Sequence, residues 1–345
     1  MDKIGKVSRM EGEGQEKITI ADVADALGVS KTTVSRAISG KGRIGAATRQ
    51  RVLDYIEVHD YKPNVIAKGL AQSKTYNLCA VMPGEYDIVD LNFFQECLFG
   101  IQETAGVMEY DVLISICKRS DLSPLERIIS NHKVDGILLM RTYMEDPQIE
   151  FLQQKKMHFV TIGSTLYPDV VQVDHSHENA CKELTSILLM KQFKRIALLG
   201  GDEGHFVNQS RLYGFREAYE EIGEKPDESM IYMNCDGGSY AVERSVNEAL
   251  EKKADCILCM DDAVAGHVLR ILREEHIKVP EDIRVASFYN SMMLENNIPS
   301  VTSLSFDARE LGQVACRTLL DMIEGKSVEP CRLLSYEVVL KESTK

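Results

Sequence analysis

The 345-residue chain lacks any run of about 18 consecutive apolar residues, the length that a membrane-spanning helix needs. Its first 16 residues carry charges throughout and lack the apolar segment of a secretory signal peptide. We therefore expect a cytoplasmic protein whose residues 1–16 form a flexible tail.

The sequence also lacks the common catalytic and phosphate-binding motifs. Its one GxGxxG match, at residues 40–45, follows a predicted helix instead of a strand and so lacks the context of a dinucleotide-binding fingerprint, and there is no P-loop, no GxSxG elbow and no HExxH zinc motif. These absences argue against dinucleotide-binding enzymes, P-loop NTPases, α/β-hydrolases and zinc proteases. We therefore expect no enzymatic activity and no cofactor.

Residue pairs with the spacing of metal ligands are scarce. The nine cysteines are odd in number and scattered through apolar segments, as free buried thiols of a reducing compartment would be. Cys256 and Cys259 form a CxxC in a strand-like run, so their side chains should point to opposite faces of a sheet. His175 and His177 lack partners at a strong spacing, and we expect them on an exposed turn. The sequence thus predicts no metal site.

Acidic residues outnumber basic ones, with 53 Asp or Glu against 40 Lys or Arg and a formal net charge of −13, but the basic residues are unevenly distributed. Residues 17–74 hold ten Lys or Arg against five acidic residues, whereas the rest of the chain carries the acidic excess. A basic head on an acidic body suits a protein that presents one end to phosphates. Chance clustering of surface charge would give the same distribution, so charge alone leaves DNA binding open.

The pattern of apolar residues changes near Lys74, where we place a domain boundary. Before it there is no strand pattern, and the sequence predicts short helices at 20–27, 31–39, 48–59 and 64–71. After it, short apolar runs typical of buried parallel strands alternate with amphipathic helical stretches. This α/β body is too long for one compact sheet, so we predict two doubly wound parallel-sheet lobes, with a crossing near 167–178.

The stretch 18–40 has the features of a helix-turn-helix. Gly28 supplies the turn after the first helix, and Ser30 is a natural N-cap for the second. On the second helix, Val34, Ala37 and Ile38 share one face, which should pack inward. The outward positions are Lys31, Thr32, Ser35, Arg36 and Ser39. Small hydroxyls with an arginine suit a DNA major groove, although an ordinary solvated helix pair would show similar spacing.

Specific motifs in this region resemble the lactose-repressor (LacI/GalR) family. They are T-I-x-D-V-A-x-x-x-G-V-S-x-x-T-V-S-R at 19–36, T-R-x-R-V at 48–52 and Y-K-P-N-x-I-A-x-G-L at 61–70. Looser matches continue to the C-terminal part, with F-F-x-E-x-x-x-G-I at 93–101, V-D-G-I-L-L at 134–139, R-x-x-G-F at 211–215, V-P-E-D-I at 279–283 and L-G-Q-V-A at 311–315. The resemblance implies a sequence-specific DNA-binding transcription regulator, a repressor, whose operator affinity responds to a small molecule.

The resemblance also implies a domain plan. After the tail, residues 17–63 would form the helix-turn-helix domain, and residues 64–74 would form a hinge helix and linker. Residues 75–345 would form an effector-binding and dimerisation body similar to periplasmic sugar-binding proteins. Its first lobe would comprise about 75–175 plus 306–332, and its second lobe about 176–305 plus 333–345.

The resemblance assigns roles to residues of the head and hinge. The base-reading candidates are Lys31, Thr32 and Arg36, and the phosphate-contacting candidates are Thr19, Ser30, Thr33, Ser35 and Arg49. The hinge at 64–71 contains Gly69 and is too short to be stably helical alone, so we expect it to fold on DNA. Leu70 matches the family's apolar wedge, which enters the minor groove and kinks the duplex. An ordinary apolar linker residue is the alternative.

An effector cleft between the lobes is implied as well. Its candidate residues are Phe93, Phe94, Arg141, Asp174, Arg211, Asp262 and Tyr289. Arg211 and Asp262 would serve a polyol as forked donor and acceptor, but either could also be a surface or capping charge. The two phenylalanines could instead belong to the core. Tyr289 stands where the family usually has an aspartate, so a sugar-related effector is an expectation and its identity is left open.

Half-site recognition calls for a homodimer on palindromic double-stranded operator DNA, and no membrane partner is expected. Whether the effector induces or co-represses stays open. The alternatives are two other classes of protein: a solute-binding protein of transport or chemotaxis, and an enzyme built on doubly wound lobes. The head and the lack of a signal peptide argue against the first, and the lack of catalytic motifs argues against the second.

Overall fold

The computed structural model describes residues 18–40, 42–61, 69, 74–84, 92–235 and 239–345. The chain divides into two compact units, residues 1–74 and 75–345, which we treat separately. The expected tail and most of the expected hinge, including Leu70, lie outside the described residues. Within the described ranges, no helix is long and apolar enough to cross a membrane.

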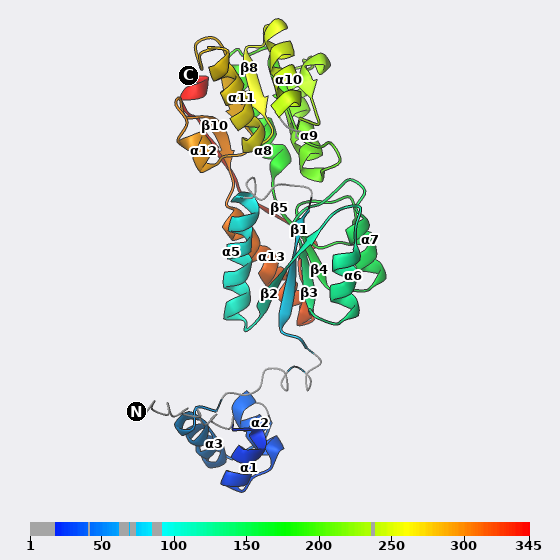
Figure 1. Ribbon diagram of the computed structural model, residues 1–345, viewed down its shortest axis with the longest axis vertical. Helices are drawn as coiled ribbons and strands as arrows, with labels where there is room; N and C mark the ends of the chain where they lie inside the picture. Colours follow the sequence, from blue (N-terminus) through cyan, green and yellow to red (C-terminus); the bar gives the residue numbers. More distant parts are fainter. Residues whose placement is uncertain (1–17, 41, 62–68, 70–73, 85–91, 236–238) are drawn as a thin grey trace, which may run out of the picture. The chain divides into compact units, whose positions relative to one another are not determined.

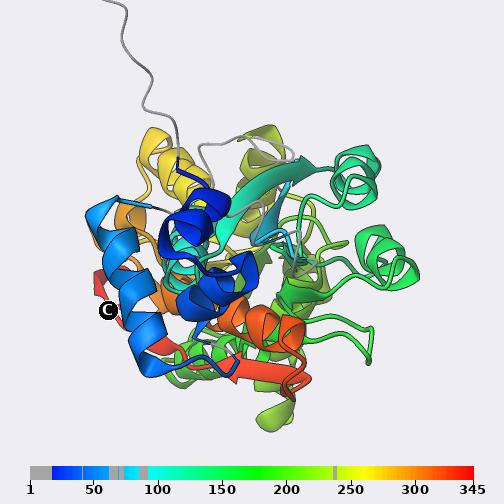
Figure 2. The ribbon, with the colours of Figure 1, turned by 90° about the horizontal axis from the view of Figure 1, so that it is seen from below.

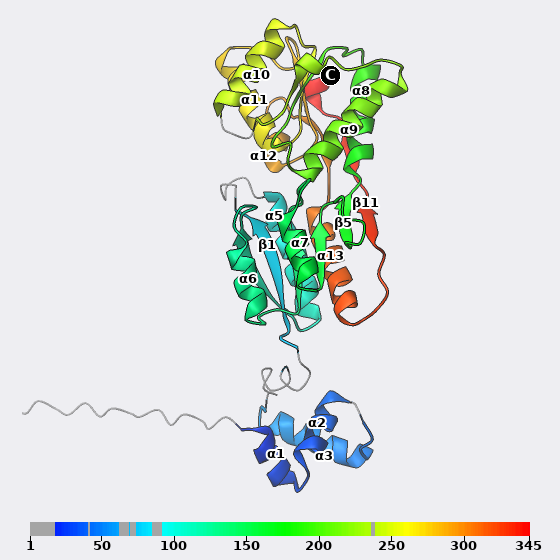
Figure 3. The same cartoon turned by 90° about the vertical axis from the view of Figure 1, so that its right-hand side faces the viewer.

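The first unit contains three helices, which Figure 3 shows packed together. They are α1 (Ile20–Leu27), α2 (Lys31–Ser39) and α3 (Ala46–Val58). Thr19 and Asp22 form a reciprocal capping box at the start of α1. Gly28 ends that helix with a φ of 63°, a left-handed conformation that favours glycine. Val23, Val34 and Val52, one from each helix, are fully buried and form the centre of this small core.

The first lobe of the second unit is built on a parallel sheet with the strand order β11-β5-β4-β3-β1-β2. Its strands are β1 (Asn77–Pro83), β2 (Asp111–Cys117), β3 (Gly136–Leu139), β4 (Phe159–Ile162), β5 (Gln172–His175) and β11 (Cys331–Leu334). Figure 2 views this sheet from below, with the teal β2 and the red β11 at opposite edges. Figure 3 shows β5 and β11 side by side.

Helices cover both faces of this sheet (Figure 1). They are α5 (Asn92–Val107) and α13 (Ala308–Ile323) on one face, with α6 (Ser123–Ser130) and α7 (Pro147–Gln154) on the other. Alternate residues of β1 follow this division, because Leu78 and Ala80 pack toward α5 and α13, whereas Cys79 packs toward α6 and α7. A strand buried on both faces explains the continuous apolar run at 77–83.

The second lobe repeats the arrangement with the strand order β12-β10-β9-β8-β6-β7. Its strands are β6 (Ile196–Leu199), β7 (Ile231–Tyr232), β8 (Cys256–Cys259), β9 (Arg284–Ser287), β10 (Thr302–Ser305) and β12 (Glu337–Val339), of which β12 is antiparallel to β10. Its longer helices are α8 (His177–Met190) and α9 (Phe206–Glu221) on one face, and α10 (Ser239–Glu251) and α11 (Asp262–Glu274) on the other. A short helix, α12 (Met292–Glu295), follows β9.

The chain passes between the lobes three times: from β5 to α8, from β10 to α13, and from β11 to β12. The last passage differs from the prediction, because Leu333 and Leu334 pair with β5 in the first lobe instead of belonging to the second. The expectation that His175 and His177 lie on an exposed turn was wrong. His175 ends β5, His177 begins α8, and both are buried.

The cysteines behave largely as predicted. Eight of the nine are buried and all are free thiols, but Cys331 is exposed, contrary to the expectation of buried thiols throughout. Cys256 packs against α8 and α9, whereas Cys259 packs on the opposite face. The CxxC pair is therefore divided between the two faces of the sheet, as the strand reading predicts.

Candidate DNA-reading face and effector cleft

The second helix of the head, α2, presents a polar face to solvent. The Ser30 side chain accepts a hydrogen bond from the Thr33 backbone N–H at 3.1 Å, which caps the helix. Val34 and Ala37 are buried, while the base-reading candidates Lys31, Thr32 and Arg36 are exposed, as is Ser35. The exposed face is therefore free to approach a nucleic-acid groove.

Several of the phosphate-contacting candidates have a structural partner inside the head. Thr19 and Ser30 are the N-cap residues of α1 and α2. Arg49, from α3, donates from Nη2 to the Gly40 carbonyl oxygen at 3.0 Å and so closes the C-terminus of α2. Arg51 does the same for α1, donating to the Leu27 carbonyl oxygen at 3.1 Å. Sequence reasoning missed this second cap, although the T-R-x-R motif holds both arginines.

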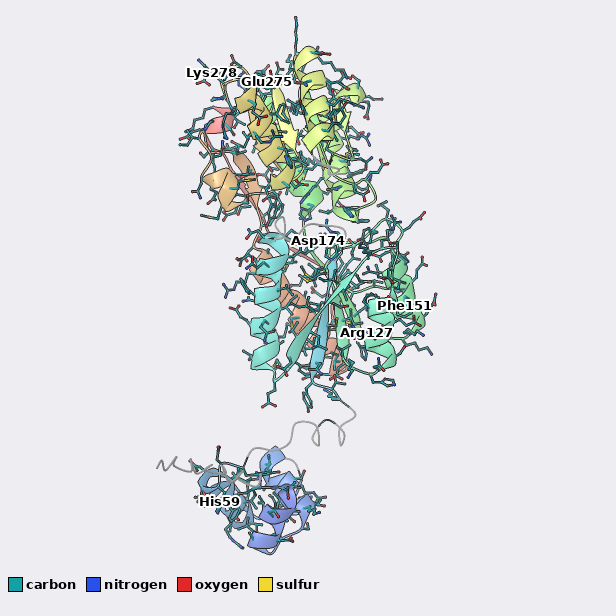
Figure 4. The ribbon with its side chains drawn as sticks, in the orientation of Figure 1. His59, Arg127, Phe151, Asp174, Glu275 and Lys278 are labelled. Atoms are coloured by element: carbon teal, nitrogen blue, oxygen red, sulfur yellow. The ribbon has the colours of Figure 1, made fainter. Side chains whose placement is uncertain are left out.

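A cavity of about 210 Å³ lies in the second unit and is lined by residues of both lobes. All seven predicted cleft residues line it: Phe93, Phe94, Arg141, Asp174, Arg211, Asp262 and Tyr289. They come from α5, the ends of β3, β5 and β9, and the starts of α9 and α11. Figure 4 shows Asp174 where the two lobes meet. Lining residues that were not among the predicted cleft residues include Asn92, Thr142, His177, Asp202, His205, Asn208 and His267.

Asp174 is held by several hydrogen bonds on the first-lobe wall. Its Oδ2 accepts from both the backbone N and the Oγ of Ser164 at 2.8 Å, and its Oδ1 accepts from the His175 backbone N at 2.8 Å. Burial alone would raise the pKa of Asp174, but nearby His177 and these hydrogen bonds outweigh it and lower the pKa. Asp174 is therefore an ionised, oriented acceptor at neutral pH.

On the second-lobe wall, Arg211 and Asp262 bring opposite charges into the cavity. Arg211 is buried, with a long contact of 3.5 Å from its Nη1 to Asn208 Oδ1, and its Nε has no hydrogen-bond partner among the described residues. Burial raises the pKa of Asp262, although the positive charge of Arg211 opposes this rise. Both side chains thus retain hydrogen-bonding capacity for a bound molecule.

Aromatic rings form another part of the cavity wall. Phe93 meets the ring of Tyr289 edge-on with centroids 6.0 Å apart, and Tyr289 stacks on Phe306 at 6.3 Å. The guanidinium of Arg141 lies 5.0 Å from the centre of the Phe94 ring. Phe94 also belongs to the buried core of the first lobe, so for this residue the core and cleft interpretations both hold. Burial raises the pKa of Tyr289, which keeps its hydroxyl as a donor.

A backbone pairing between the lobes borders the cavity, and sequence reasoning missed it. The Met144 N–H donates to the Gly204 carbonyl oxygen at 2.9 Å, and the Phe206 N–H donates to the Thr142 carbonyl oxygen at 3.2 Å. Between these bonds, the rings of Tyr143 and His205 lie 5.3 Å apart. We call residues 142–144 and 204–206 the interlobe latch. It joins the lobes on one side of the cleft.

Comparisons with known protein families agree with this division into a head and a body. The model of the family described as "Bacterial regulatory proteins, lacI family" matches residues 19–64. The model described as "Periplasmic binding protein-like domain" matches residues 185–344. The first match contains the capped helix pair, and the second covers most of the second lobe.

Similar curated proteins span nearly the whole chain. The HTH-type transcriptional regulator MalR of Streptococcus pneumoniae is 28% identical over 334 residues, covering 94% of this chain and 99% of that protein. Catabolite control protein A of Staphylococcus aureus is 28% identical over 338 residues, covering 95% of this chain and 99% of that protein.

Solved structures with the same architecture include two complexes. The transcriptional regulator CelR bound to cellobiose is 26% identical, with a TM-score of 0.71, covering 94% of this chain and 99% of that one. The lac repressor dimer bound to operator and the anti-inducer ONPF is 22% identical, with a TM-score of 0.78, covering 95% and 99%. At 22% identity the second likeness concerns the fold. Together with the capped helix pair and the two-lobed body, these matches show that the chain belongs to the lacI family of bacterial regulatory proteins, which are DNA-binding transcriptional regulators.

Proposed function

We propose that this protein is an operator-binding repressor, with Lys31, Thr32 and Arg36 reading base edges in the major groove. The exposed polar face of α2, presented by a capped helix with a buried apolar side, is the observation that carries this proposal. Thr33 and Ser35 on the same helix are the phosphate-contacting candidates that suit it best. Leu70 stays a prediction for the minor-groove wedge.

Gel-shift assays with the DNA upstream of the protein's own coding sequence test this proposal. We expect Arg36→Ala to relax sequence preference at one position of each half-site, because an arginine that reads a guanine contributes about 1–3 kcal/mol of discrimination. Arg43→Ala removes the same charge from an exposed position outside α2, so it should leave the sequence preference unchanged. If both variants lower affinity equally for all sequences, α2 does not read bases.

We also propose that a small hydroxylated molecule, sugar-related in its chemistry, binds between the lobes and alters operator affinity. The buried guanidinium of Arg211, whose Nε lacks a partner within the described structure, supports this proposal most directly. Asp174 and Asp262 add oriented acceptors, and the Tyr289 ring adds a stacking surface. The cellobiose complex of a related regulator is consistent with such a ligand.

A thermal-shift screen of mono- and disaccharides, followed by calorimetry, would identify this ligand. We expect Arg211→Lys to weaken binding at least about tenfold, because an ammonium cannot reproduce forked hydrogen bonding. Arg216 lies on the same helix but pairs with Glu228 at the surface, so the control variant Arg216→Ala should bind the sugar normally. A ligand that binds equally to both variants would lie outside this cavity.

We propose that the protein acts as a homodimer on a palindromic operator. Two residues of the edge strand β2 support the presence of an uncovered apolar surface, because Ile114 and Ile116 share one face of the strand and are exposed by 60% and 62%. Phe99, on the neighbouring α5, is also exposed. A second copy of the chain suits this surface, because two half-sites require two heads. Sedimentation analysis of Ile114→Asp should give monomers, whereas Leu166→Asp, at an exposed residue outside this edge, should stay dimeric.

A further inference from the structure

Asp174, His175 and His177 form a buried cluster where the chain first passes from one lobe to the other. Asp174 and His175 end β5, and His177 begins α8. His175 is 1% exposed and His177 is 7% exposed. Each residue offers one ligand atom, and these atoms all lie within 4.8 Å of one another. Figure 4 shows Asp174 at this junction.

The imidazole nitrogens of this cluster are poorly satisfied. Both ring nitrogens of His175 and Nδ1 of His177 are buried without a well-formed hydrogen bond in the part of the chain that the structure describes, although the backbone of Asp307 lies close enough to His175 to interact with its ring. The two rings pack against Phe306 at centroid distances of 5.0 and 4.7 Å, which accounts for the burial of their carbon atoms. It does not account for the nitrogens, because buried polar atoms without partners destabilise a fold unless an unseen partner satisfies them.

The carboxylate of Asp174 is oriented as a metal ligand would be. Ser164 fixes its Oδ2 with two hydrogen bonds, and the His175 backbone N–H occupies one lone pair of Oδ1. The remaining lone pair of Oδ1 faces Nε2 of His177 at 3.4 Å. Two ligand atoms at that separation can both reach a tetrahedral ion with bonds of about 2.0–2.2 Å.

We propose that Asp174, His175 and His177 bind a divalent transition-metal cation of the Zn²⁺, Co²⁺ and Ni²⁺ class. Two imidazoles with one carboxylate favour these ions over Mg²⁺ and Ca²⁺, which prefer all-oxygen sites. Three protein ligands leave a coordination position open. Because Asp174 and His177 also line the cavity, the cation would lie on the cleft wall. This site revises the expectation of a metal-free protein, which treated the two histidines without Asp174.

Titration of the chelator-treated full-length protein with Co²⁺ tests the site. The Cys331→Ser variant is the suitable starting protein, because Cys331 is the cysteine that the structure leaves exposed and its thiol would compete for metal. We expect one equivalent of Co²⁺ to bind, with the visible absorption of a tetrahedral nitrogen and oxygen site and no thiolate charge-transfer band. Zn²⁺ should displace it, whereas Mg²⁺ should not.

His175→Gln and His177→Gln should each weaken binding by about 100-fold or more, since even outer-shell partners of a metal ligand change affinity about 10- to 100-fold. His132→Gln changes an exposed histidine of the same lobe and should bind normally. A second measurement keeps the test valid if a variant folds less stably. Zn²⁺ should raise the Tm of the Cys331→Ser starting protein and of His132→Gln, but not the Tm of His175→Gln or His177→Gln. Full binding to both cluster variants, a thiolate band, or no binding to the starting protein would overturn the proposal. DNA binding is measured separately and does not depend on this outcome.

Discussion

Replacing Arg49 with alanine should destabilise α2 by about 1–2 kcal/mol. In the structure, Arg49 donates to the carbonyl oxygen of Gly40, which ends that helix with a φ of 69°. A hydrogen bond from a charged group is worth about 1.5–3 kcal/mol, and a cation near a helix C-terminus about 0.3–1 kcal/mol. Arg49 is partly exposed, so solvent screens both interactions, and we expect about 1–2 kcal/mol instead of their full sum.

The assay is amide hydrogen exchange of residues 31–40 in the full-length chain. A loss of 1–2 kcal/mol corresponds to exchange that is about 5- to 30-fold faster, if the helix opens locally. Arg43→Ala is the matched control, because it removes the same charge from an exposed position of the head and leaves the cap intact.

DNA binding over a series of salt concentrations distinguishes this role from a phosphate contact. A residue that neutralises one phosphate contributes about 0.9 to the slope of log K against log salt concentration. We expect Arg49→Ala to weaken binding by a similar factor at every salt concentration, because it loosens α2, the helix that we propose reads the bases. An unchanged exchange rate in α2, together with a slope that falls by about 0.9, would refute the capping argument.

Two further predictions concern the body. Gly100→Ala should destabilise the first lobe by about 1–3 kcal/mol in urea unfolding, because its new Cβ would overlap the Arg309 carbonyl oxygen on α13, whereas Gly106→Ala on the same helix meets nothing and should be neutral or stabilising. Burial lowers the pKa of His205 to about 3, so the unfolded chain binds its proton first as the pH falls. This residue therefore removes stability below about pH 6.5, by up to about 1.4 kcal/mol per pH unit down to its folded pKa. His205→Gln should flatten the dependence of the free energy of unfolding on pH in this range. The control variant His276→Gln, at an exposed position, should keep the slope of the unchanged protein.

The sequence was most informative where local chemistry determines local structure. The turn at Gly28 and the cap at Ser30 depend on residues within a few positions, and both are present as predicted. The apolar runs at 77–83 and 256–260 predicted β1 and β8, since a strand buried on both faces must be continuously apolar.

Sequence reasoning failed where a strand carries residues of the site. β5 reads Q-V-D-H and was not predicted as a strand, because its polar residues break the apolar pattern, although the crossing predicted near 167–178 does follow this strand. Asp174 and His175 are polar because they end the strand at the cleft. β7 was missed because it has two residues, and β10 (T-S-L-S) and β11 (C-R-L-L) were missed because polar residues interrupt the apolar run that revealed β8. The interlobe latch could not be predicted at all, since it depends on backbone groups of two segments that meet only after both lobes fold.

The latch and the first crossing give the cleft two different kinds of connection. The crossing from β5 to α8 is covalent and stays in place in every state of the protein, whereas the latch consists of two backbone hydrogen bonds that can break. Hydrogen bonds of this kind contribute about 0.5–1.5 kcal/mol each, so the two bonds of the latch contribute about 1–3 kcal/mol, a free energy that one or two good contacts with a ligand can match. The molecule that we propose for the cleft would contact both lobes through Asp174 and Arg211, so its binding would favour the arrangement in which the latch joins the lobes. We expect its effect on operator affinity to depend on whether DNA binding favours the same arrangement.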